Sequence, residues 1–80
     1  MEPNSSQALV ETIDARGHRC PVPTLKLRRR LEMAHAGAVF VLRADDPMAQ
    51  IDVPHFCNQN SYVLEDVEAR DNEWLFRVRR

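Results

Sequence analysis

Cys20 is the side chain of this 80-residue chain with the clearest chemical potential, because Pro21-Val22-Pro23 follows it directly. Prolines suit the first turn of a helix, where backbone N–H groups have no partner. The spacing therefore predicts a helix that begins immediately after Cys20, with the cysteine at the N-cap. Unpaired N–H groups and the positive end of the helix dipole would there stabilise a thiolate. Pro21 also restricts the backbone of Cys20 and so fixes the direction of its sulfur.

Basic side chains surround this cysteine. Residues 16–30 contain six cations and no acid: Arg16, Arg19, Lys26, Arg28, Arg29 and Arg30. Such a positive field lowers the pKa of a thiol and attracts acidic partner surfaces, although a solvated helix face explains the same pattern. The candidates for biasing the thiolate or docking a partner are Arg16, His18, Arg19, Lys26 and Arg29.

Two familiar cysteine chemistries do not fit the residues around Cys20. A Cys-x-x-Cys redox pair needs a second cysteine three positions on, where the chain has Pro23. Hydrolysis by a Cys–His pair needs a third group that orients the histidine, and His18 has no obvious one. Thiol exchange remains, in which a cysteine accepts a group and hands it on. Sulfane sulfur, held as a persulfide, is the natural cargo.

His18-x-Cys20 and His55-x-Cys57 suggest a zinc site, but we expect none. Side chains two positions apart on a helix point in nearly opposite directions, so His55 and Cys57 should not converge on a metal ion. We expect Cys57 to be a core residue.

The remaining acidic and aromatic motifs favour structural roles. Asp45-Asp46-Pro47 is typical of a helix start, so we expect these two carboxylates at an N-cap and a first turn. Trp74 alternates in phase with the apolar residues of a predicted strand, which favours core packing over stacking on bases.

Length and composition predict one small globular domain. The chain has 11 Lys and Arg against 12 Asp and Glu and is 44% hydrophobic, which argues against a generic, strongly basic nucleic-acid binder. It has no apolar run long enough for a membrane span, and its start does not look like a signal peptide. Two cysteines are too few for a disulfide scaffold, so we expect a reduced cytoplasmic setting. Residues 1–7 are predicted to be a flexible lead-in, and residues 8–80 the domain.

The elements that position Cys20 follow from periodicity and turn residues. We predict strands at 9–13, 38–42, 62–68 and 74–79, and helices at 22–35 and 53–59. Gly17 permits a turn before Cys20. Pro54 argues against one long straight helix, so we expect the second helix to start only at residue 53, with Asp52 as its cap. The order is β-α-β-α-β-β. It predicts an α/β two-layer sandwich, a mixed four-stranded sheet with two helices on one face.

Residues 14–27, with Gly17 and Cys20-Pro21-Val22-Pro23, closely resemble the defining Cys-Pro-x-Pro segment of the TusA (SirA-like) sulfur-carrier family. Residues 45–47 and 52–57 resemble a second region of that family. In the first region, the family usually has leucine where this chain has His18. The resemblance runs from about residue 9 to residue 79 and implies the strand order 1-2-4-3.

The resemblance also implies a function. Cys20 would be the catalytic residue that receives sulfur as a persulfide from a cysteine desulfurase or another sulfur-donor protein. A downstream acceptor protein would then take the sulfur, for tRNA 2-thiouridine formation, molybdenum-cofactor-related chemistry or sulfur metabolism. We expect no cofactor, no metal, no membrane contact and no direct nucleic-acid contact, and we expect a monomer.

The alternative is a noncatalytic adaptor or RNA-binding module in which Cys20 is structural and Arg28–Arg30 contact phosphates. An ordinary or raised thiol pKa would favour this alternative.

Overall fold

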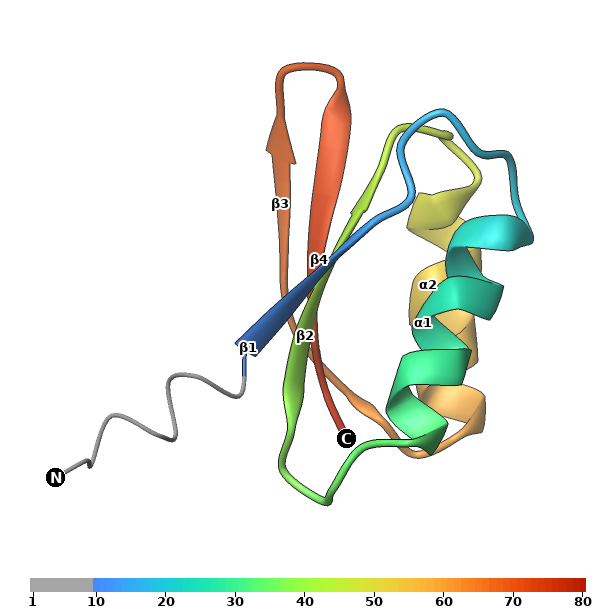
Figure 1. The fold of residues 1–80 in the computed structure, drawn as a ribbon. Coiled ribbons are helices and arrows are strands. Elements are labelled where there is room, and N and C mark those ends of the chain that lie inside the picture. Colours follow the sequence, from blue (N-terminus) through green and yellow to red (C-terminus); the bar gives the residue numbers. More distant parts are fainter. Residues whose placement is uncertain (1–9) are drawn as a thin grey trace, which may run out of the picture.

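The computed structural model describes residues 10–80 and shows four strands and two helices (Figure 1). The predicted lead-in at residues 1–7, and Leu9 of the first predicted strand, lie outside the described residues. The elements in chain order are β1 (Val10–Asp14), α1 (Val22–Glu32), β2 (Val39–Ala44), α2 (Ala49–Gln59), β3 (Val63–Arg70) and β4 (Glu73–Arg79).

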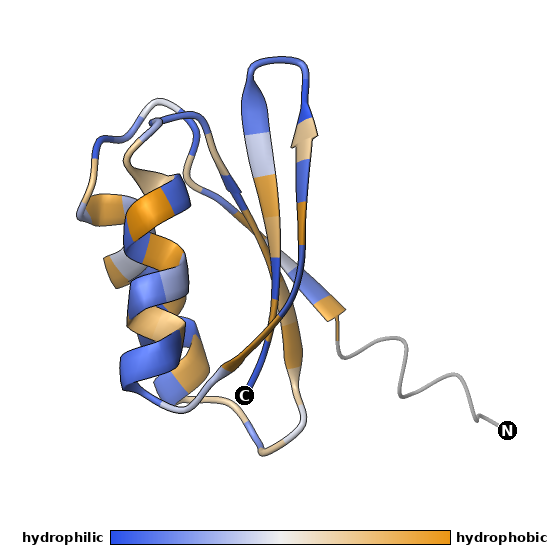
Figure 2. Ribbon diagram, turned by 180° about the vertical axis from the view of Figure 1, so that it is seen from behind, coloured by the Kyte–Doolittle hydropathy of each residue, from blue (hydrophilic) through white to orange (hydrophobic). Residues whose placement is uncertain are grey.

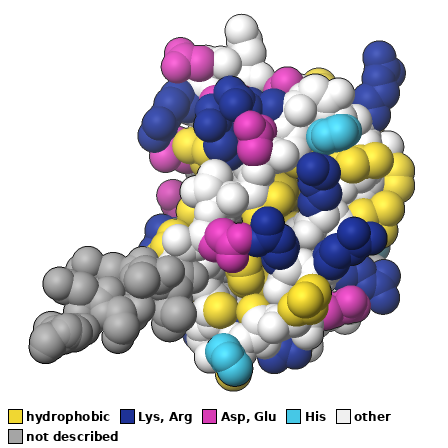
Figure 3. All heavy atoms as spheres, viewed as in Figure 1, with side chains coloured by type: hydrophobic (Ala, Val, Ile, Leu, Met, Phe, Trp, Pro, Cys, Tyr) yellow, Lys and Arg dark blue, Asp and Glu magenta, His cyan; other side chains and the backbone are white. Residues whose placement is uncertain are grey.

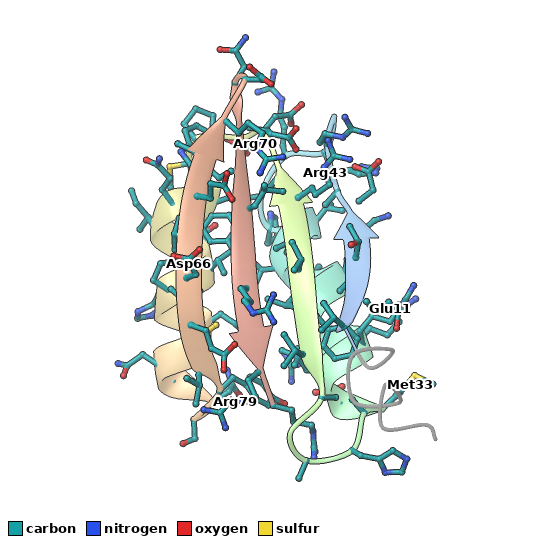
Figure 4. All side chains as sticks on the ribbon, turned by 90° about the vertical axis from the view of Figure 1, so that its left-hand side faces the viewer. Glu11, Met33, Arg43, Asp66, Arg70 and Arg79 are labelled. Carbon is teal, nitrogen blue, oxygen red and sulfur yellow. The ribbon has the colours of Figure 1, made fainter. Side chains whose placement is uncertain are left out.

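The four strands form one mixed sheet in the order β1-β2-β4-β3. β1 is parallel to β2, from Val10 opposite Val39 to Asp14 opposite Arg43, and β4 is antiparallel to both of its neighbours. Both helices lie on the same face of the sheet, behind the strands in Figure 4. The predicted two-layer α/β sandwich and the strand order implied by the resemblance are therefore confirmed.

The core lies between the helices and the covered face of the sheet, where the hydrophobic segments of the two layers face each other (Figure 2). Leu27 and Leu31 are fully buried four residues apart on α1, because that spacing places them on one side of the helix. They share the core with Phe76 on β4 and Cys57 on α2. The prediction that Cys57 is a core residue is confirmed. Trp74 is partly buried and packs against this core.

The second helix begins four residues earlier than predicted, at Ala49 rather than Val53. Ala49 and Val53 are both fully buried on the same face, so packing supports the additional turn. Pro54 lies inside the helix, at the sixth of its eleven residues, where its missing N–H removes one backbone hydrogen bond. The prediction that Asp52 caps this helix is wrong, because Asp52 lies within the first turn.

Residues with positive φ angles lie in the turns that join the elements. Gly17 has a φ of 83° and lies in the β1–α1 loop, three residues before Cys20. Asp71 and Asn72, with φ angles of 47° and 67°, form the hairpin turn between β3 and β4. Within residues 10–80, neither helix has the length and apolar character that crossing a membrane requires.

Candidate functional site

Cys20 lies at the end of the β1–α1 loop, half-buried against the core. The helix after it begins at Val22, as predicted, but Pro21 and not Cys20 occupies the N-cap. The first bonds of this turn run from the Val22 N–H to the Arg19 carbonyl and from the Leu25 N–H to the Pro21 carbonyl, both at 2.9 Å. The peptide bond between Cys20 and Pro21 is cis. The sulfur therefore precedes the helix by one more residue than the sequence indicates.

Two aspartates in the β2–α2 loop hold the loop that carries Cys20. The Gly17 N–H donates to Oδ1 of Asp45 at 2.9 Å, and the Cys20 N–H donates to Oδ2 of Asp46 at 2.8 Å. Oδ1 of Asp46 also accepts the Met48 N–H at 3.1 Å, close to the start of α2. These bonds lower the pKa of Asp46, because backbone N–H groups stabilise its charged form.

The thiol of Cys20 is not biased toward the thiolate, contrary to our expectation. Its pKa is raised to about 11, first by burial, then by a side-chain hydrogen bond and the charge of Asp52, and last by the charge of Asp46. Burial disfavours the charged form of a thiol, and neighbouring carboxylates add to that effect. The carboxylates of α2 and its preceding loop thus outweigh the basic residues around Cys20.

Arg16 illustrates why a basic residue close to Cys20 in sequence need not lower the pKa of its thiol. Its guanidinium donates to both carboxylate oxygens of Asp14, at 2.9 and 2.8 Å, and this pairing holds the pKa of Asp14 well below its usual range. Arg16 is therefore engaged with its own strand end instead of with Cys20. This pairing gives Arg16 no stronger influence on the Cys20 thiol than that of the other exposed cations.

Lys26 and Arg29 line an open hollow of about 420 Å³ on α1. Its apolar part includes Val22, which is 37% exposed, and Leu25, which is 51% exposed. Arg30 also lines it and forms an ion pair with Glu11 of β1. Figure 3 shows basic and hydrophobic side chains interleaved on this side of the molecule. We call the hollow the α1 hollow; it begins two residues after Cys20.

His18 and Arg19 lie on the other side of the Cys20 loop. Together with Gly17 they line a polar hollow of about 410 Å³, whose opposite wall is the 45–47 segment. The structure thus divides the predicted docking residues between two hollows, Lys26 and Arg29 in one and His18 and Arg19 in the other.

A third, shallower hollow of about 300 Å³ lies between the two helices next to the cysteine. Pro21 and Thr24 of the α1 side face Asp52 and His55 of α2 across it. The Thr24 hydroxyl is buried without a hydrogen-bond partner among the described residues. Pro23 is buried in the core side of α1, so it anchors the first turn.

The second His-x-Cys pair does not have the arrangement of two metal ligands. His55 is exposed while Cys57 is buried, so they face opposite sides of α2. In the described part of the chain, no group of three or more His, Cys, Asp or Glu side chains is arranged to hold a metal ion.

Sequence reasoning assigned Asp45, Asp46 and Asp52 to a helix start alone and missed their contacts with the Cys20 loop. The parallel pairing of β1 with β2 brings the ends of both strands to one edge of the sheet. The loops that follow these strands therefore meet. The available signal was the predicted β-α-β unit, in which Gly17 follows the first strand and the acidic residues follow the second strand.

Comparisons with known proteins agree with this architecture. The family model described as sulfurtransferase TusA matches residues 11–80. The crystal structure of a SirA-like protein from Desulfitobacterium hafniense is similar, with a TM-score of 0.72 and 24% sequence identity. The similarity covers 86% of this chain and 93% of that one. At this identity the crystal structure supports the fold alone.

Proposed function

Since the chain belongs to the sulfurtransferase TusA family, we propose that it carries sulfane sulfur as a persulfide on Cys20. A sulfur-donor protein, such as a cysteine desulfurase, would load Cys20, and an acceptor protein would unload it. The observation that carries the proposal is the position of Cys20, a free and half-buried cysteine on a loop that is held between two hollows. A thiol placed in this way can meet the sulfur of another protein without a substrate pocket.

The transfer step is a thiol exchange with no net oxidation. The sulfur of Cys20 attacks the outer sulfur of the donor's persulfide, and a new S–S bond forms on Cys20. The S–S bond of the donor breaks, and its electron pair leaves with the donor's cysteine. The proton lost by Cys20 ends on that departing sulfur. Unloading repeats the same step with Cys20 as the donor.

The raised pKa of Cys20 means that the free carrier holds a protonated thiol at neutral pH. Loading therefore requires activation in the complex with the donor. A donor that places a cation beside Asp46 and Asp52 would cancel their charges and lower the thiol pKa. Such a carrier reacts poorly with small electrophiles and well with a docked partner, and a reduced compartment such as the cytoplasm would keep its thiol free.

The α1 hollow is the surface we assign to partner docking. Val22 and Leu25 provide exposed apolar area, and Lys26 and Arg29 provide positive charge at its rim. A partner with an apolar side chain flanked by carboxylates fits this combination, since complementary charge speeds association. His18 and Arg19 extend the docking surface on the other side of Cys20.

Persulfide loading tests the proposal directly. The full chain is incubated with a cysteine desulfurase and cysteine, and intact-mass spectrometry follows the addition of one sulfur mass. We expect the adduct on the wild type and on Cys57→Ala, but not on Cys20→Ser. An adduct that persists in Cys20→Ser, or none on the wild type, would refute Cys20 as the carrier.

The raised thiol pKa also favours a second candidate, an adaptor or RNA-binding module in which Cys20 is structural. This candidate predicts salt-sensitive RNA binding that survives Cys20→Ser and weakens when Arg28, Arg29 and Arg30 are changed to glutamine. Filter binding at two salt concentrations separates the two candidates, because the sulfur carrier predicts no such binding.

A further inference from the structure

Asp46 joins three parts of the site with one side chain. Oδ2 accepts the Cys20 N–H at 2.8 Å, and Oδ1 accepts the Met48 N–H at 3.1 Å. The Asp46 carbonyl also accepts the Ala49 N–H at 2.9 Å, in the first turn of α2. Cys20 and Asp46 are 26 residues apart in the chain, so this contact ties the cysteine to a distant element.

Cys20 has few other polar restraints. The α1 helix has no side-chain cap, and Pro21 has no N–H to donate. The loop before Cys20 is held at Gly17 by Asp45, and its Arg16 side chain binds back to Asp14. Among the described residues, the bond to Asp46 is therefore the one that holds the backbone N–H of the cysteine itself.

We propose that Asp46 is the positioning residue of the sulfur-transfer site: its carboxylate binds the Cys20 N–H and the start of α2 together, and so fixes the sulfur relative to both helices. This inference rests on the proposed function. The Asp46 charge, held at the Cys20 N–H, also adds to the raised pKa of Cys20, after burial and Asp52. Asp46 thus has two separable effects, one of its hydrogen bonds and one of its charge.

Two variants separate these effects. Asp46→Asn keeps an acceptor oxygen and removes the charge, whereas Asp46→Ala removes both. Asp66→Ala is the matched control, because Asp66 lies on β3 at the opposite edge of the sheet from β1 (Figure 4). Thermal melting of each variant confirms that the chain remains folded.

Amide hydrogen exchange of the Cys20 N–H, followed by NMR, reports the bond. We expect exchange to be at least about tenfold faster in Asp46→Ala and within about threefold of wild type in Asp46→Asn. Alkylation of Cys20 with iodoacetamide, followed against pH, reports the charge. We expect its midpoint to fall in both Asp46 variants, by up to about half a pH unit because burial and Asp52 contribute more to the raised pKa, and to stay unchanged in Asp66→Ala.

A purely structural role would accelerate exchange broadly and would leave the midpoint of Asp46→Asn unchanged, and that pattern would overturn the proposal. Unchanged Cys20 exchange in a folded Asp46→Ala would overturn it as well.

In persulfide loading from a desulfurase, we expect Asp46→Ala to lower kcat several-fold with little change in KM, and Asp46→Asn to recover part of the loss. An unchanged kcat would likewise overturn it. A wild-type chain that takes up no sulfur refutes the carrier function instead, while exchange and alkylation still decide whether Asp46 positions Cys20.

Discussion

Arg43 on β2, labelled in Figure 4, binds Glu73 at the start of β4 through two N–H groups, with N–O distances of 2.9 and 2.7 Å. The backbone carbonyl of Arg43 also accepts the Ala15 N–H at 2.8 Å, at the beginning of the loop that leads to Cys20. The pair therefore secures the end of the sheet from which both site loops leave. Bidentate Arg–carboxylate pairs are geometrically specific as well as favourable.

The Arg43–Glu73 pair predicts a pH-dependent stability difference. Arg43 lowers the pKa of Glu73 below its usual value of 4.5, so the pair stabilises the fold above that value. Its contribution is lost as the pH falls through the lowered pKa. Glu73→Gln should therefore have a lower Tm than wild type at pH 7 and a smaller deficit in acid. Glu68→Gln, which breaks the exposed pair with Arg70, is the control and should change Tm less. A deficit of equal size at both pH values would contradict the prediction.

Leu25 and Leu27 on α1 form a matched pair for separating docking from stability. Leu27 is fully buried, so Leu27→Ala should lower the free energy of unfolding by about 3 kcal/mol, from lost transfer energy and the cavity left behind. Leu25 is 51% exposed in the α1 hollow, so Leu25→Ala should leave stability nearly unchanged and weaken binding of a sulfur donor. Urea unfolding and binding titrations measure the two effects. Equal destabilisation by the two variants would refute this assignment.

Lys26 and Arg29 should control the rate at which an acidic partner associates. The double variant Lys26→Gln/Arg29→Gln removes both charges from the rim of the α1 hollow, and we expect association to slow by about threefold at low salt. The difference should shrink as salt screens the charges. Arg70→Gln, which removes a charge near the β3–β4 turn, should bind at the wild-type rate. Surface plasmon resonance with a desulfurase provides the rates, and an equal effect in Arg70→Gln would exclude a localised docking surface.

The sequence predicts the elements around Cys20 well because local signals decide them. Pro21 and Pro23 locate the start of α1 at Val22, and Gly17 has the positive φ angle of the predicted turn before Cys20. The start of α2 was misjudged because the local rule for Pro54 was outweighed by packing. Buried Ala49 on the same face of α2 extends the helix toward β2.

The electrostatics of the site could not be predicted in the same way. The positive charges near Cys20 are close in sequence, whereas the carboxylates that oppose them lie 26 and 32 positions further on, at Asp46 and Asp52. Only the parallel register of β1 and β2 brings these acids to the cysteine. Arg16 shows the converse, since it is near Cys20 in sequence and yet pairs with Asp14.

Asp52 should raise the pKa of Cys20 through its charge, and removing that charge should make the thiol more reactive. The pKa of Cys20 is about 11, so the wild-type alkylation rate should keep rising from neutral to strongly alkaline pH. Asp52→Asn removes a nearby carboxylate, which favours the thiolate, so its rate should level off at lower pH and exceed the wild-type rate at pH 7. Peptide mapping assigns the label to Cys20, because buried Cys57 also has a pKa raised to about 11 and should react slowly. A wild-type profile that levels off below about 8.5, the ordinary thiol value, would show that the basic residues around Cys20 outweigh Asp46 and Asp52.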